Sequence, residues 1–207
     1  GIDGSDNIVS HYITLNFILS KHKPKVICLE LMPSDFEKQP DPFSTISFFA
    51  PYFGKSEGAD SVFRLAGKYW EYRISHLYRY NAKAISNIAG LAINRNEGGD
   101  HGYLPNPQPA QYPTSLAHGF PITKVDSLKL KYVQKFIDLC RKNNIKLVFV
   151  VSPMYVKVDK DYYDPLKAIA ARNHVPFMDY HTEGLFLDHP DYFRDSNHLW
   201  DKGARLY

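Results

Sequence analysis

Residues 128–151 read LKLKYVQKFIDLCRKNNIKLVFVV, in which a helix pattern is followed at once by a strand pattern. Apolar residues recur there every three or four positions and so mark one buried helix face: Leu128, Tyr132, Phe136, Leu139 and Cys140. After two asparagines, the run 145–151 is almost wholly apolar and rich in β-branched residues, as strands are. The segment therefore predicts a helix over 128–142 and a strand over 145–151.

The same order of helix and strand occurs upstream. Apolar residues spaced by three and four positions predict a helix over 8–21, with Asp6 or Asn7 as its N-cap. After a proline, residues 25–31 (KVICLEL) form a short, almost unbroken apolar run. Such a run is typical of a parallel strand, and we expect this strand to be buried on both faces.

A third unit follows downstream, with a helix expected over 164–173 and a strand over 175–179. Repeated units of helix and strand are the pattern of α/β proteins, whose sheets are mainly parallel. We therefore predict an α/β fold, flavodoxin-like, with three layers in the order α/β/α around a parallel sheet.

Residues 36–124 separate the first unit from the second and are too many for a structureless loop. Their centre, residues 62–91, is rich in aromatic residues and has the spacing of one or two helices. These aromatic side chains could stack on sugar rings, but their helical spacing favours packing between helices. We expect one domain, residues 1–207, in which 36–124 form a helical lid or cap.

The composition restricts the function classes. Lys and Arg number 25 against 22 Asp and Glu, and they are scattered, so the concentrated positive field that nucleic-acid binding needs is not expected. The longest apolar run is far below the roughly 20 residues that span a bilayer. No charged-then-apolar signal pattern opens the sequence, and the chain as given is expected to be soluble. Cys28 and Cys140 lie in strand and helix patterns, where buried single thiols are expected.

Residues 193–199 read FRDSNHL and place Asp195 three residues before His198, shortly after the last expected strand. In a serine hydrolase this spacing can supply the acid that orients an imidazole and the imidazole that acts as general base. The alternative is a loop carboxylate beside a surface histidine in a polar turn. The neighbouring histidines and aspartates lack tight metal-ligand spacing, so neither a metal nor a cofactor is expected.

Together with two upstream segments, this motif resembles the SGNH (GDSL-like) hydrolase superfamily. Residues 1–6 (GIDGSD) are similar to its second block, residues 29–35 (LELMPSD) to its third, and the D-x-x-H motif to its last. The resemblance implies that His198 is the general base and Asp195 its orienting acid. It also implies that the backbone N–H of Gly4 and the hydroxyl of Ser34 form the oxyanion hole. Gly4 as a turn glycine and Ser34 as a cap remain alternatives.

Two departures from the family pattern stand out. The family's nucleophilic serine would precede Gly4, so we expect this chain to begin after the first two strands and to be nearly inert alone. Ser34 replaces the asparagine that usually donates to the oxyanion. Ser5 matches an N-cap better than a substitute nucleophile. Without the first two strands, residues 25–31 would form a sheet edge, where dimerisation is expected.

The resemblance implies an SGNH-type esterase or O-acyltransferase that acts on acyl esters, most simply acetyl esters, of cell-envelope glycans. Members of this kind often accompany membrane-bound O-acyltransferases, so such a partner and an envelope location are expected. Tyr103, in a Gly/Pro-rich loop, is the candidate substrate-binding residue. The alternative is a non-catalytic protein that binds glycans or assists polysaccharide assembly with a degenerate SGNH fold.

Overall fold

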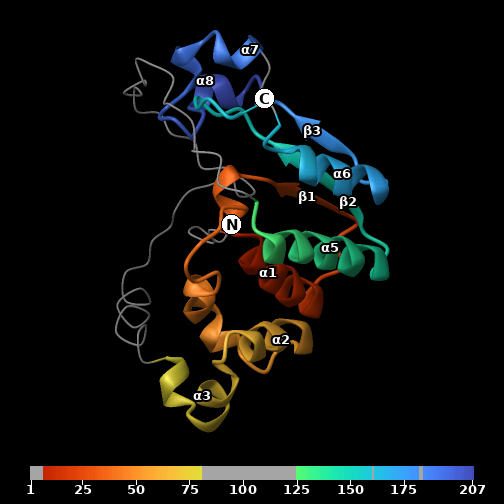
Figure 1. Ribbon diagram of the computed structural model, residues 1–207, viewed down its shortest axis with the longest axis vertical. Coiled ribbons are helices and arrows are strands. Elements are labelled where there is room, and N and C mark those ends of the chain that lie inside the picture. The colour runs from red at the N-terminus through yellow and green to blue at the C-terminus, as the bar shows by residue number, and fades with distance from the viewer. Residues whose placement is uncertain (1–6, 81–124, 160, 182–183) are drawn as a thin grey trace.

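The computed structural model describes residues 7–80, 125–159, 161–181 and 184–207. Its sheet has three parallel strands in the order β1-β2-β3 (Figure 1): Val26–Glu30, Lys146–Val151 and Phe177–Asp179. The predicted α/β class with a parallel sheet is confirmed. Gly4 and Tyr103 lie outside the described residues.

Helices α1, α5 and α6 span Ile8–Lys21, Ser127–Lys142 and Asp164–Arg172. These bounds agree with the predicted helices to within one residue. Asn7 caps α1, because its Oδ1 accepts hydrogen bonds from the backbone N–H groups of Val9 at 3.0 Å and Ser10 at 3.3 Å. α1 and α5 lie side by side along the sheet (Figure 1).

These three helices share one hydrophobic core with the odd-numbered strand residues, which include Leu29, Leu147 and Phe149. The even-numbered residues face the other way and stay outside that core. Val26 is 52% exposed and Met178 is 45% exposed. The described helices α1, α5 and α6 therefore cover one face of the sheet.

The expectation that β1 is buried on both faces is wrong, and so is the expected burial of Cys28, which is exposed. Successive side chains of a strand point to opposite faces, and the described helices cover only the odd-numbered side. β1 is also an edge strand of the described sheet, as predicted. Cys140 is buried in α5, as predicted.

The described part of the insertion, residues 36–80, is helical as expected. It contains the 3-10 helices η2 (Ser44–Tyr52) and η3 (Leu77–Arg79) and the α-helices α2 (Glu57–Leu65) and α3 (Tyr69–Ile74). α2 and α3 are separate helices because the chain turns at Gly67, whose φ is +72°.

Aromatic rings hold these helices together, which agrees with the packing interpretation. The Phe53 and Phe63 ring centroids lie 5.4 Å apart, and those of Phe63 and Tyr72 lie 5.3 Å apart. Residues 81–124, the rest of the expected lid, lie outside the described residues.

Four short helices complete the described chain: η1 (Pro33–Asp35), α7 (Gly184–Leu187), η4 (Pro190–Tyr192) and α8 (Asp201–Ala204). Helix η1 follows the carboxyl end of β1 directly. Of the helices that the structure describes, none has both the length and the apolar character needed to cross a bilayer.

Candidate functional site

Asp195 and His198 lie in a tight loop that closes on itself. An isolated antiparallel bridge joins Phe193 to Leu199, and the N–H of Arg194 donates to the carbonyl oxygen of His198 at 2.8 Å. The loop thus has the form of a small hairpin, which brings both side chains of the D-x-x-H motif to one side.

This loop is fastened to the segment that follows β2. The N–H of Tyr155 donates to the carbonyl oxygen of Ser196 at 2.8 Å. Tyr155 also belongs to a small second core with Phe186 and Phe193, and the Tyr155 and Phe193 ring centroids are 5.2 Å apart. The motif is therefore held near the carboxyl end of the sheet, where ligand sites of α/β proteins form.

The two side chains make a close contact. His198 Nδ1 lies 2.8 Å from Asp195 Oδ1 and 3.0 Å from Asp195 Oδ2. Asp195 Oδ1 also accepts backbone N–H bonds from Asn197 at 2.9 Å and from His198 at 3.0 Å. The carboxylate is thus fixed by its own turn before it orients the ring, as an Asx turn does.

The charge of Asp195 suits this role. Partial burial raises the pKa of the carboxyl, but the backbone N–H of Asn197 and the ring of His198 lower it by more, so the pKa lies below its usual range. A carboxylate that stays ionised and faces Nδ1 selects the tautomer in which Nε2 can accept a proton. The side chain of His198 is 69% exposed, so a reactant can reach the ring.

Ser34 is the one other predicted site residue within the described part of the chain. Ser34 lies in η1, just beyond β1, and therefore at the same carboxyl end of the sheet as the Asp195 loop, which is bonded to the segment after β2. In the described part of the chain, no serine hydroxyl donates a hydrogen bond to His198.

Sequence reasoning missed two further pairs of His and Asp at the carboxyl ends of the strands. His11 Nε2, in the first turn of α1, lies 3.6 Å from Oδ1 of Asp35. His181 Nδ1 lies 3.6 Å from Oδ1 of Asp179, the last residue of β3. The first pair joins residues 24 positions apart, and no local spacing marks it. The second pair has a D-x-H spacing, which would be a weak signal on its own.

The carboxylate of Asp179 is strongly perturbed. His181 and Lys167 hold its pKa at about 2, against burial that raises it. The closer contact of Asp179 is with Lys167, whose Nζ lies 2.8 Å from Oδ2. His181 Nδ1, at 3.6 Å from Oδ1, is too far away for a hydrogen bond. This cluster ties α6 to the end of β3.

We expect Asp179→Asn to lower the free energy of unfolding by up to about 2 kcal/mol near pH 7. The folded pKa is lowered, so the carboxylate stabilises the fold above its unfolded pKa of about 3.9. That contribution is lost as the pH falls toward about 2. Urea titrations at several pH values should show the variant and the wild type converging in acid. Asp138→Asn, at an exposed carboxylate of α5, is the control. A difference independent of pH would contradict the ionic origin.

Lys129, in the first turn of α5, is fully buried, and its Nζ has no hydrogen-bond partner among the described residues. Burial lowers the pKa of this amine, although the nearby carboxylates of Asp126, Asp35 and Glu37 act in the opposite direction. The Lys129 amine and the Asp35 carboxylate therefore belong to a second group of titratable side chains, near the carboxyl end of β1.

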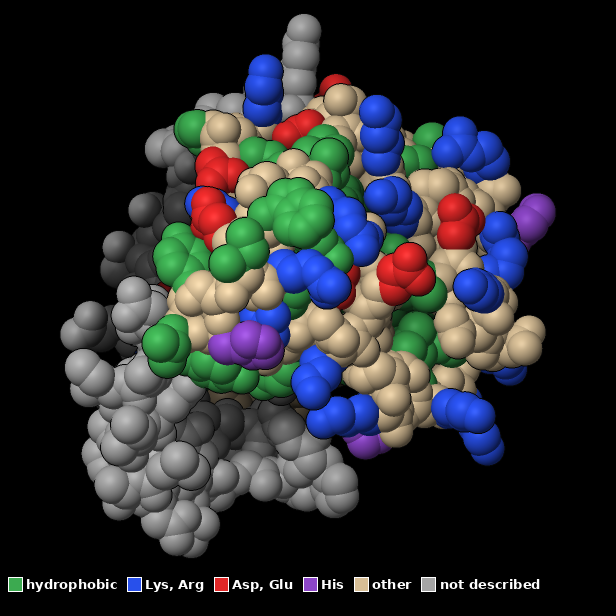
Figure 2. Space-filling model, turned by 90° about the horizontal axis from the view of Figure 1, so that it is seen from below, with side chains coloured by type: hydrophobic (Ala, Val, Ile, Leu, Met, Phe, Trp, Pro, Cys, Tyr) green, Lys and Arg blue, Asp and Glu red, His purple; other side chains and the backbone are tan. Residues whose placement is uncertain are grey.

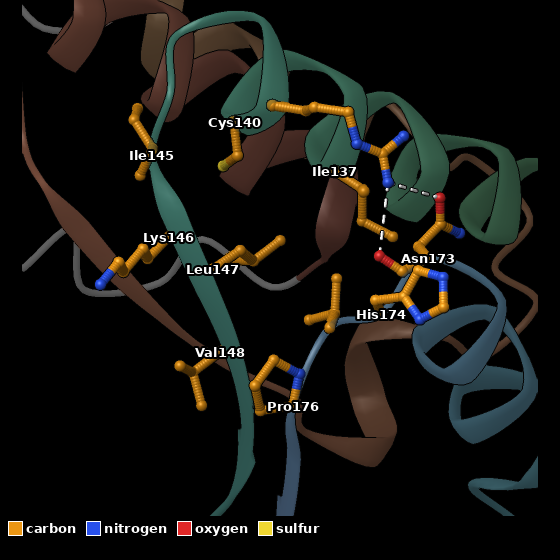
Figure 3. A pocket seen from close by; sticks show the side chains of 11 residues that line it. Ile137, Cys140, Ile145, Lys146, Leu147, Val148, Asn173, His174 and Pro176 are labelled. Atoms are coloured by element: carbon orange, nitrogen blue, oxygen red, sulfur yellow. Dashed lines mark hydrogen bonds between the residues drawn. The ribbon is translucent and has the colours of Figure 1, made fainter.

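A hollow of about 340 Å³ lies at the other end of the sheet, between α5 and the amino ends of β2 and β3 (Figure 3). Its thiol, Cys140, has a pKa raised to about 11 by burial, so it stays protonated at neutral pH and is a poor nucleophile. Arg141 Nη2 donates to the backbone and side-chain oxygens of Asn173, each at 3.3 Å. Arg141 and Asn173 are thus engaged with each other.

No group of three or more potential ligands among His, Cys, Asp and Glu forms a metal site within the described ranges. No family model, curated protein or solved structure matches the chain.

Proposed function

We propose that this protein is a serine hydrolase of the SGNH type, an esterase or an O-acyltransferase that acts on acyl esters of cell-envelope glycans. The contact of His198 Nδ1 with both carboxylate oxygens of Asp195 carries the proposal. That contact leaves Nε2 available to accept a proton. The ring lies at the carboxyl end of the sheet, where α/β proteins place their sites.

In the proposed reaction, His198 Nε2 takes the proton of a serine hydroxyl while that oxygen attacks the ester carbonyl. The resulting oxyanion accepts hydrogen bonds from the Gly4 N–H and the Ser34 hydroxyl. His198 then gives the proton to the departing alcohol, which leaves an acyl-serine. Water in an esterase, or a sugar hydroxyl in an acyltransferase, attacks the acyl-serine with His198 again as base, and the serine is regenerated.

The turn that carries Ser34 is well held, which supports its place in this scheme. Oδ2 of Asp35 accepts the N–H of Met32 at 2.9 Å, and the N–H of Asp35 donates to the carbonyl oxygen of Met32 at 3.0 Å. Tyr162 Oη donates to the carbonyl oxygen of Pro33 at 2.6 Å. These bonds fix the backbone from which the Ser34 hydroxyl projects.

The partners belong to the same proposal. The substrate is an acylated glycan, with Tyr103 as a contact, and a membrane-bound O-acyltransferase supplies or receives the acyl group. The location is the cell envelope. Two copies associate through the edge strand β1, whose outer backbone N–H and C=O groups would pair with those of the other copy.

The test is labelling of the protein in its full natural length with a fluorophosphonate probe, followed by mass spectrometry to locate the adduct. We expect one labelled serine, outside the described residues, and we expect no labelling in His198→Ala. The control is His189→Ala, because His189 also neighbours a carboxylate, Asp191, at 3.8 Å. Equal loss in both variants would argue against a specific role for His198.

A second candidate is a non-catalytic glycan-binding or assembly protein. It is favoured by one observation, the lack of a described serine hydroxyl bonded to His198. A folded protein that takes no label at any serine would support this candidate and contradict the enzyme.

A further inference from the structure

A hollow of about 890 Å³ lies between α1 and η2, lined by eleven of the residues in the segments 14–22 and 48–55. The volume falls in the range of roughly 300–1,000 Å³ that small-molecule sites occupy. It adjoins the last turns of α1, which lead into the amino end of β1. The hollow is therefore at the opposite end of the sheet from the Asp195 loop and separate from the proposed acyl chemistry.

The floor of this hollow is apolar and already packed. The Phe17 ring contacts those of Phe49 and Tyr52, with centroid distances of 6.2 Å and 5.2 Å. Phe49 is only 3% exposed, while Ile18 is 39% exposed and Tyr52 is 52% exposed. The hollow thus has a fixed floor and half-exposed walls, whose burial by a ligand would be favourable.

The rim is basic. Of the eleven lining residues, Lys21, His22 and Lys55 are basic and none is acidic. Neither lysine forms an ion pair with a carboxylate of the described residues. Lys21 lies in the last turn of α1, where it also offsets the partial negative charge of the helix end. Lys55 is not part of α1 and has no such role. Figure 2 shows the molecule from below, with hydrophobic side chains interspersed with Lys, Arg, Asp and Glu.

We infer that this hollow binds a long-chain fatty acyl anion, with the chain over Phe17, Ile18 and Tyr52 and the carboxylate beside Lys21 and Lys55. The two exposed ammonium groups favour an anionic head group over an uncharged one. A concave site between two helices fits a single chain, whereas a membrane surface requires apolar side chains that protrude. This site adds ligand binding to the protein, independently of whether the Asp195 loop is catalytic.

The test is the fluorescence of dansyl-labelled undecanoic acid added to the whole protein. We expect the emission to rise and shift to the blue, and laurate to displace the probe. Dodecanol has the same chain without the charge and should compete more weakly. Lys21→Gln combined with Lys55→Gln should weaken binding by roughly 3- to 30-fold, as two exposed charge contacts would.

Ile18→Glu tests the apolar wall and should abolish the fluorescence change. Ile74→Glu is the matched control, because Ile74 is 81% exposed on α3 and does not line the hollow. No change with the wild type, equal loss in both variants, or equal competition by dodecanol and laurate would overturn the inference. So would binding only to phosphatidylglycerol vesicles, which would identify a membrane surface instead. Circular dichroism of each variant verifies the fold.

Discussion

Asp195→Asn is expected to lower the rate of acetyl-ester hydrolysis by roughly four powers of ten, as loss of the orienting acid does in Ser-His-Asp enzymes. An amide in place of the carboxylate can donate to Nδ1, which then must accept, so the proton moves to Nε2. The ring would then be unable to take the serine proton. The two backbone N–H bonds to Oδ1 can still form, so the loop should keep its shape.

The measurement is hydrolysis of p-nitrophenyl acetate by the full-length protein, with His198→Ala beside it. His198→Ala should lose at least as much activity as Asp195→Asn, because it removes the base itself. The parts of such a unit act together, so the losses should not add in the double variant. His189→Ala should keep the wild-type rate. An Asp195→Asn variant with nearly full activity would show that the carboxylate does not orient the base.

Phe193→Ala is expected to release the loop that carries Asp195. Phe193 is fully buried, and it belongs to the small second core rather than the main one. Truncation of a buried phenylalanine costs about 3–5 kcal/mol, and a core of this size has few neighbours that could close the cavity. We therefore expect the loss of order to concentrate in residues 184–207, with the helices on the sheet retained.

Hydrogen exchange of the backbone measures this directly. In Phe193→Ala, the N–H groups of Tyr155 and Arg194 should exchange faster, because both are bonded within or to the loop. Leu166→Ala is the control, since Leu166 is fully buried in the main core. That variant should lose global stability without selective exchange in the loop. Uniform destabilisation in both variants would mean that the second core is no independent unit.

Much of the secondary structure was predictable because it depends on local periodicity. The apolar spacing over 8–21 gave α1 with its observed bounds, and Asn7 could be proposed as a cap from its place before the first apolar residue. The contact of Asp195 with His198 could be expected too, because it lies within one turn. Each of these features is fixed by neighbours in the sequence.

Contacts between distant segments could not be predicted. The burial of Lys129 depends on where α5 packs, and a lysine beside two leucines carries no sign of it. His11 meets Asp35 only because α1 and η1 come together at the end of β1. In the floor of the hollow between α1 and η2, Phe17 likewise meets Tyr52 only because η2 packs on α1.

The sequence by itself determined the order of helices and strands, the α/β class, the parallel sheet and the close pair Asp195 and His198. Only the tertiary structure decided which side of β1 is covered, so that Leu29 is buried while Cys28, next to it, is exposed. The reason is physical: periodicity is a property of neighbouring residues, whereas burial depends on which elements pack against each face. In the described chain, α1, α5 and α6 all pack against the same face.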